Sequence, residues 1–284
     1  MGYQYYMYDP SKAAAIPFAA LFGLTTIVHI WQTIRTRTWY MAPFIIGGIF
    51  EAIGYLCRFI SATQTPNWTM YPYIGQSLLI LLGPALFAAS IYMLLGRIIR
   101  TLNAGSVSPI RPNWLTKIFV AGDLPDRKDR ALTSIEGGGM QAGAKTQDRA
   151  EMGEKMILGG LFVQILFFSI FIVVSVIFHR RMLSTPVHRM GTDVPWNKYL
   201  KVLYLVSFLI LIRSLYRVAE YIQGKEGALQ SNEVYIYVLD AFLMLVCCVI
   251  LNVWHPSNVV SGKQAPYKRA EDLEMLANNG RMHF

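Results

Sequence analysis

The sequence predicts an all-α, polytopic transmembrane helix bundle. Hydrophobic residues make up 54% of the 284-residue chain and charged residues only 15%. The runs 73–96 and 156–178 contain no Asp, Glu, Lys or Arg, and each is long enough to cross about 30 Å of hydrocarbon as a helix. Lipid offers no hydrogen-bond partners to the backbone. We therefore expect these runs to be helices, which pair their backbone N–H and C=O groups internally, rather than open sheets.

Six spans follow in order from the hydropathy of the chain, each a long and mostly apolar run. They are residues 13–34, 42–60, 73–96, 156–178, 200–222 and 234–254. The N-terminal region has no basic segment and no small-residue cleavage site, so we expect the first span to be retained as a signal anchor.

Charge placement calls for a seventh crossing between the third and fourth of these spans. Residues 101–155 are polar, with five Asp, Arg or Lys residues within 124–136, so hydropathy alone does not support insertion there. If this segment does not cross, the basic loop at Arg180 and the basic tail at Lys263 fall outside the cell, whereas one crossing makes every basic cluster cytoplasmic. We therefore predict a seven-span plan with a degenerate, polar fourth span.

In this plan the N-terminus lies outside and the C-terminus in the cytoplasm. Residues 1–262 form the bundle, with a polar insert at 101–155, and residues 263–284 form a cytoplasmic tail. Asn67 begins the Asn-Trp-Thr sequon of the second loop, which this plan places outside, and is a glycosylation candidate.

Charged residues inside the apolar runs are the candidates for function, because each costs at least roughly 2.5–3.5 kcal/mol at the bilayer centre unless paired or wetted. They are Glu51, Arg58, Arg213, Arg217, Glu220 and Asp240. Glu51 and Arg58 are seven residues apart, as are Arg213 and Glu220, so each pair shares a helix face. We hypothesise a ladder that joins Glu51 to Arg213 and Arg58 to Glu220, with Arg217 available to Asp240.

Six short motifs, in order along the spans, carry a resemblance to a known family. They are Tyr8-Asp9-Pro10-Ser11, Glu51-x-x-Gly54-Tyr55-x-x-Arg58, Gln76 with Gly83-Pro84-x-x-x-Ala88-Ala89-x-x-Tyr92, Gly159-Gly160-Leu161-x-x-Gln164, Arg213-x-x-Tyr216-Arg217-x-x-Glu220 and Asn252-x-x-His255-Pro256. Together they resemble the fungal lipid-translocating exporter family. The resemblance implies a seven-span plasma-membrane protein that moves amphipathic lipids such as sphingoid long-chain bases and is linked to resistance to toxic lipids or drugs. The chain departs from the family at 124–136, where the family usually has a mostly apolar stretch.

Two interpretations of the intramembrane charges remain open. Ion pairs hold helices in register in many proteins without acting on a ligand. Alternatively, the charges line a polar groove for a lipid head group, with an ammonium at Glu51, Glu220 or Asp240 and a phosphate or hydroxyl at Arg58 or Arg217.

Other function classes have weaker support. An intramembrane lipid hydrolase needs clustered His and Asp, but the five histidines are scattered, so we expect no enzyme, metal or other cofactor. A seven-span receptor that signals rather than transports stays open as the main alternative. The basic residues lie beside spans and the glycines at 137–139 lack the Lys and Ser/Thr of a phosphate loop, so the expected partners are membrane lipids rather than nucleic acid or nucleotide.

Overall fold

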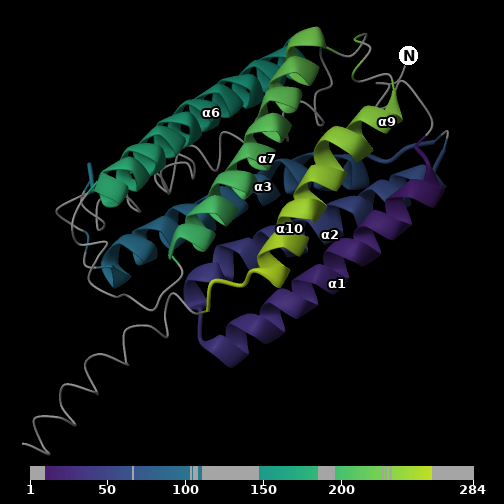
Figure 1. Ribbon diagram of the computed structural model, residues 1–284. Helices are drawn as coiled ribbons and strands as arrows, with labels where there is room; N and C mark the ends of the chain where they lie inside the picture. The colour runs from purple at the N-terminus through teal and green to yellow at the C-terminus, as the bar shows by residue number, and fades with distance from the viewer. Residues whose placement is uncertain are drawn as a thin grey trace, which may run out of the picture.

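The computed structural model describes residues 10–65, 67–102, 104, 108–110, 147–184, 196–224, 227, 229 and 232–257 (Figure 1). The described residues form helices and turns and contain no strand. The helices are α1 (Lys12–Thr36), the short η1 (Trp39–Met41), α2 (Ala42–Thr63), α3 (Met70–Thr101), α6 (Gln147–Ser184) and α7 (Trp196–Gln223). The last helix is continuous but changes type, from α9 (Glu233–Ile236) through the π-helical turn η3 (Tyr237–Phe242) to α10 (Leu243–Val253).

The six predicted spans are confirmed, because six helices of the described residues are long and apolar enough to cross a membrane. α6 begins at Gln147, nine residues before the run predicted from hydropathy, and therefore extends into the segment expected to be a polar insert. Local sequence explains several helix ends. Pro lies in the first turn of α2, where its missing N–H costs nothing, and Gly224, with φ of 68°, follows the end of α7.

The first and last helices run in parallel. At one end the Ser11 backbone N–H donates to both Glu233 carboxylate oxygens at 3.0 Å, and further along His29 Nε2 donates to the Cys248 carbonyl at 3.1 Å. At the other end the Tyr40 hydroxyl donates to the Pro256 carbonyl at 3.1 Å. Residues 10 and 257 therefore lie at opposite ends of the bundle.

α3 and α6 also run in parallel, although they are consecutive among the described helices. Leu81 packs with Ile157 and Leu161, and eleven residues later along α3 the Tyr92 ring meets Phe171 with centroids 4.5 Å apart. The connection from α3 to α6 consequently starts at one end of the bundle and finishes at the other.

Two regions with sequence predictions lie outside the described residues. The polar interval 124–136, where the fourth crossing was expected, belongs to residues 111–146, and the expected cytoplasmic tail is residues 263–284.

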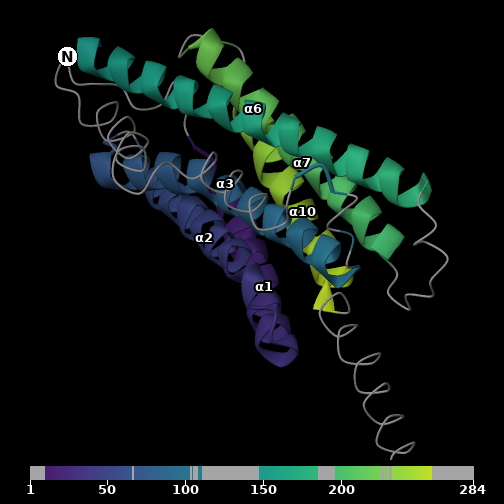
Figure 2. The ribbon, with the colours of Figure 1, turned by 90° about the vertical axis from the view of Figure 1, so that its left-hand side faces the viewer.

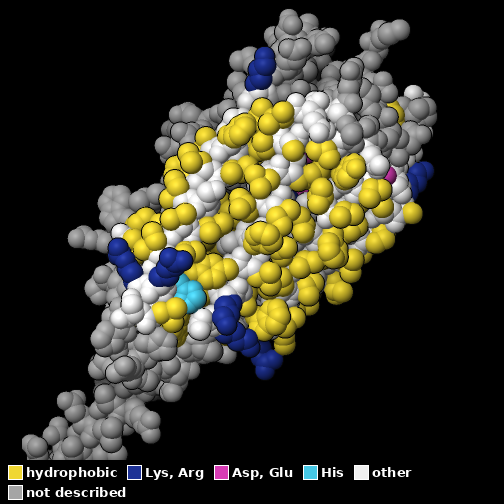
Figure 3. All heavy atoms as spheres, turned by 45° about the horizontal axis from the view of Figure 1, so that its top comes forward, with side chains coloured by type: hydrophobic (Ala, Val, Ile, Leu, Met, Phe, Trp, Pro, Cys, Tyr) yellow, Lys and Arg dark blue, Asp and Glu magenta, His cyan; other side chains and the backbone are white. Residues whose placement is uncertain are grey.

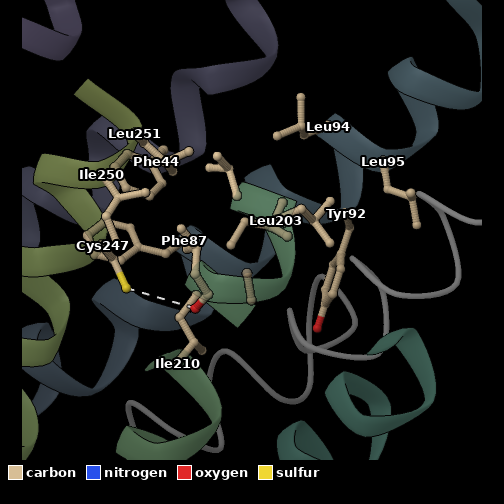
Figure 4. Packing of buried hydrophobic residues seen from close by; sticks show 14 of the residues in the cluster. Phe44, Phe87, Tyr92, Leu94, Leu95, Leu203, Ile210, Cys247, Ile250 and Leu251 are labelled. Atoms are coloured by element: carbon tan, nitrogen blue, oxygen red, sulfur yellow. Dashed lines mark hydrogen bonds between the residues drawn. The ribbon is translucent and has the colours of Figure 1, made fainter. Parts of the chain in front are cut away.

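In space the helices form two groups. α1, α2 and α3 pack together on one side, α6 and α7 form a pair on the other, and the last helix lies between them (Figures 1 and 2). Aromatic and aliphatic side chains fill the interior, with Phe44 stacked on Phe87 at 4.2 Å. Cys247 and Cys248 are buried in this interior, and Cys247 Sγ donates to the Val206 carbonyl at 3.9 Å (Figure 4).

The outer surface is apolar, as a membrane requires. Ile27 and Phe208, for example, are 64% and 58% exposed, and Figure 3 shows hydrophobic side chains covering one face, with Lys and Arg at its margins. Because α1, α3 and α6 end where α7 begins, many basic residues gather at this one end of the bundle, which we call the basic end. They are Arg35, Arg37, Arg97, Arg100, Arg180, Arg181, Lys198 and Lys201.

Candidate functional site

Two arginines of α7 meet one aspartate of the last helix in the interior of the bundle. Arg213 Nε lies 2.6 Å from Asp240 Oδ1, and both side chains are fully buried. Arg217 Nη2 bonds the other oxygen, Asp240 Oδ2, and Arg217 Nη1 lies 2.9 Å from Glu220 Oε2. The arginines are four residues apart and share a helix face, which allows both to reach the same carboxylate.

A proline on α3 provides a further partner for Arg213. Pro84 has no backbone N–H, so the carbonyl of Ile80, four residues earlier, loses its helical partner. Arg213 Nη2 donates to this carbonyl at 2.6 Å. A neighbouring helix thus satisfies the carbonyl that the proline leaves without a partner.

Asp240 reaches the arginines from an irregular part of its helix. It lies within η3, the π-helical turn Tyr237–Phe242. An inserted residue of this kind rotates the side chains that follow it, and such turns occur frequently at functional sites. Nothing in the apolar pattern of the run signals the turn, so sequence reasoning missed it.

Glu51 of α2 is the exceptional member of this region. It is fully buried, and among the described residues neither of its carboxylate oxygens has a hydrogen-bond partner. Asp240, Arg213 and Arg217 are the charged groups that act on it electrostatically. A buried carboxyl in this condition demands an explanation, because nearly all buried polar groups in proteins are hydrogen-bonded.

Glycines on α2 and α3 make room for the Glu51 carboxyl. A Cβ atom added at Gly83 would lie 2.8 Å from Glu51 Oε1 and 3.1 Å from Glu51 Cγ. One added at Gly47 would lie 2.7 Å from the Gly83 carbonyl oxygen. The two helices therefore approach closely over small residues, and the Glu51 side chain lies against the bare backbone of α3.

Other polar atoms around Glu51 share its condition. Within the part of the chain that the structure describes, the Tyr55 hydroxyl, Arg213 Nη1 and Arg217 Nε are buried and also lack a hydrogen-bond partner. Tyr55 is one helical turn from Glu51 on the same face of α2. Acceptors and donors left over in one region of an apolar bundle are what a polar ligand can satisfy.

A second ion pair lies two turns from Glu51, toward the end of the bundle opposite the basic end. Arg58 Nη2 lies 2.7 Å from Glu233 Oε1, and Arg58 Nε donates to the Tyr237 hydroxyl at 3.0 Å. Glu233 is the more accessible partner, with 16% of its side chain exposed against 1% for Arg58.

An aromatic layer separates this outer pair from Glu51. Tyr55 stacks on Phe22 at 5.6 Å between centroids, and Phe18 stacks on Tyr237 at 5.3 Å. Tyr55 and Tyr237 are themselves 6.1 Å apart. The rings come from α1, α2 and η3, so these three elements pack together between Glu51 and the outer pair.

The hypothesised ladder is wrong in both rungs. Arg213 binds Asp240 instead of Glu51, and Arg58 binds Glu233 instead of Glu220, which pairs within its own helix. α2 and α7 do run in parallel, as the ladder required, because each is antiparallel to the last helix. The rungs fail because the last helix, with Asp240 and Glu233, supplies the nearer carboxylates. The expected pairing of Arg217 with Asp240 is confirmed.

Glu233 is the site residue that sequence reasoning missed. It lies just before the apolar run 234–254, so it was not counted as intramembrane. Asn232, which accepts a hydrogen bond from the Val234 N–H at 3.1 Å, is a recognisable N-cap, and it could have placed Glu233 in the first turn of a helix.

The fold and the buried charges define a polytopic helical membrane protein with an ionic cluster at its centre. Comparison with known sequences places it more closely: the chain belongs to the family of RTA1 like proteins, whose sequence profile matches residues 44–263. The matched range includes every charged residue of the cluster.

Several curated relatives are fungal proteins with names that indicate lipid transport or porphyrin uptake. Protoporphyrin uptake protein 1 of Saccharomyces cerevisiae is 32% identical, over 89% of this chain and 92% of its own. The probable lipid transporter atnI of Emericella nidulans is 30% identical, over 95% and 72%. The sphingoid long-chain base transporter RSB1 of Saccharomyces cerevisiae is 23% identical, over 89% and 74%. No solved structure matches the chain.

These relatives confirm the resemblance to the lipid-translocating exporter family and support a lipid-exporter-like role in a membrane.

Proposed function

We propose that this protein translocates amphipathic lipids with a cationic head group, in particular sphingoid long-chain bases, and that Glu51 receives the ammonium group. The observation that carries the proposal is the fully buried Glu51 carboxyl, which has no hydrogen-bond partner among the described residues. An ammonium supplies three N–H donors and a compensating charge.

The ion pairs narrow the choice among the three carboxylates that sequence analysis considered. Asp240 is bound by two arginines and Glu220 by one. A ligand ammonium at either position would have to displace a guanidinium from a charge-assisted hydrogen bond. Glu51 requires no such displacement and is therefore the preferred acceptor.

The surrounding atoms suit the rest of a sphingoid head group. Such a base carries hydroxyl groups next to its ammonium, and a hydroxyl both donates and accepts. The Tyr55 hydroxyl and Arg213 Nη1 are available for these groups in the described structure. The hydrocarbon chain of the lipid would remain against the apolar surfaces of the helices.

The basic end indicates how the protein is oriented in the membrane. Lys and Arg flanking spans are retained in the cytoplasm, so we assign the basic end to the cytoplasmic side and the Arg58–Glu233 pair to the outer side. This places the N-terminal end of α1 outside and the C-terminal end of α10 inside, in the plasma membrane that the resemblance implies.

The proposal distinguishes cations from anions. Protoporphyrin, for which one relative is named, carries two carboxylic acid groups, and these supply no cation to pair with the Glu51 carboxylate. We therefore expect the protein to prefer a sphingoid base over a porphyrin.

An export assay tests the proposal. Cells of a fungal host lacking its own base exporter are loaded with radiolabelled dihydrosphingosine, and the label released to the medium is measured with and without this protein. We expect expression to increase release, Glu51→Gln to abolish the increase and Glu51→Asp, which keeps the carboxyl, to retain part of it. Equal amounts of each variant at the cell surface are the control. Wild-type release from cells expressing Glu51→Gln would refute the assigned role of Glu51.

A further inference from the structure

The ionic cluster is electrically balanced without Glu51. Arg213 and Arg217 carry two positive charges, and Asp240 and Glu220 carry two negative charges that contact them directly. An ionised Glu51 would add one uncompensated negative charge in the interior of the bundle. With no donor among the described residues to stabilise it, this charge would carry the full cost of desolvation.

We propose that Glu51 is a neutral carboxylic acid when no ligand is present, and that binding of the cationic head group displaces its proton. The inference rests on the proposed function and adds the source of energy to which lipid transport is coupled. In the exchange the O–H bond of Glu51 breaks, the proton leaves to bulk water, and the ligand ammonium keeps all its hydrogens and becomes the counter-ion of the carboxylate. One proton leaves for one cation bound, so the charge of the site does not change.

The other groups that face Glu51 do not exchange a proton for the ligand cation in its place. Arg213 and Arg217 of α7 both bind Asp240 of η3. Tyr55 of α2 and Cys248 of α10 carry a phenol and a thiol, which are much weaker acids than a carboxylic acid.

The remaining neighbours of Glu51 are either bound to other groups or have no titratable side chain. On α1, His29 Nε2 donates to the Cys248 carbonyl, and α3 faces Glu51 with Gly83, which has no side chain. Arg58, two turns away on α2, is paired with Glu233. Among the described residues, Glu51 is the carboxyl left to exchange its proton for a ligand cation.

The consequence is coupling of lipid export to a proton gradient. A proton that binds Glu51 from an acidic exterior releases the base outside, and a base that binds from the cytoplasm releases the proton inside. Because one monovalent cation is exchanged for one proton, the pH difference drives the cycle and the membrane potential does not. Each pH unit can sustain about a tenfold concentration ratio of the base.

Proton release on binding is measured by calorimetric titration of the purified full-length protein in lipid nanodiscs. The probe is sphingosine at about pH 6, well below the ordinary pKa of an alkylamine, so it binds already protonated and any released proton comes from the protein. Titrations at one pH in two buffers of different ionisation enthalpy give the number of protons released per ligand bound. We expect about one for the wild type and for Glu51→Asp, and none for Glu51→Gln.

The wild type alone supplies a second readout that does not depend on a variant folding. If one proton is displaced, affinity for protonated sphingosine should rise about tenfold per pH unit while Glu51 is neutral in the unliganded protein. Binding of the probe without proton release or pH dependence would overturn the exchange and leave the lipid proposal standing. Failure of the wild type to bind sphingosine would overturn both.

Discussion

Replacement of Gly83 by alanine tests whether the Glu51 carboxyl depends on the close approach of α2 and α3. The added Cβ would lie 2.8 Å from Oε1, 3.1 Å from Cγ and 3.2 Å from Cδ of Glu51. Contacts this short force the carboxyl to move away from α3, toward the arginines of α7 or into the aromatic layer. We expect Gly83→Ala to perturb the site without changing any of its polar groups.

The magnitude follows from two opposing effects. Alanine in a helix interior is favoured over glycine by roughly 0.5–1 kcal/mol. Overpacking of a tight interior costs typically about 1–3 kcal/mol. Since the methyl meets three atoms of one side chain, we expect the second effect to prevail and the variant to lose about 1–2 kcal/mol of stability.

Two other glycines serve as matched controls. A Cβ added at Gly23 of α1 or Gly159 of α6 meets no atom within 4 Å, so Gly23→Ala and Gly159→Ala should be neutral or slightly stabilising. The assay is thermal unfolding of detergent-solubilised protein, followed by export of dihydrosphingosine. If Gly83→Ala matched the two controls in both measurements, the described contact between Glu51 and Gly83 would be refuted.

The remaining predictions concern the ion cluster and the topology. Asp240→Asn leaves two buried guanidinium groups without their shared carboxylate, so we expect a loss of about 3–5 kcal/mol, seen as a lower melting temperature; unchanged melting would contradict the double pairing. Asn67 should carry a glycan, so glycosidase should shift the gel mobility of the wild type and leave Asn67→Gln unaffected. Cysteines introduced by Thr101→Cys and Gln147→Cys should react with an impermeant maleimide from opposite sides of the membrane, and reaction from the same side would contradict the parallel course of α3 and α6.

The helices and the charged residues could be predicted from sequence because both are properties of single segments. Long apolar runs are sufficient to place each span, and the cost of a charge in lipid is sufficient to select Glu51, Arg213 and Asp240. The loss of a helical hydrogen bond at Pro84 is equally local. Each of these features depends on a residue and its immediate surroundings in the chain.

The pairing of the charges could not be predicted because it depends on which helices are lateral neighbours. Helical spacing places Glu51 and Arg58 on one face, but it does not say which helix that face meets. The position of the last helix between the two groups, and the π-helical turn that carries Asp240, decide the pairing in the structure. The hypothesised ladder therefore assumed the correct helix directions but paired Glu51 and Arg58 with the wrong residues.

The most direct test of the central claim is a structure of the full-length protein in nanodiscs with sphingosine bound. The claim predicts the ammonium nitrogen at hydrogen-bond distance, about 2.7–3.2 Å, from the Glu51 carboxylate, with Arg213 and Arg217 still bound to Asp240. A head group held elsewhere, with Glu51 turned to an arginine, would contradict it.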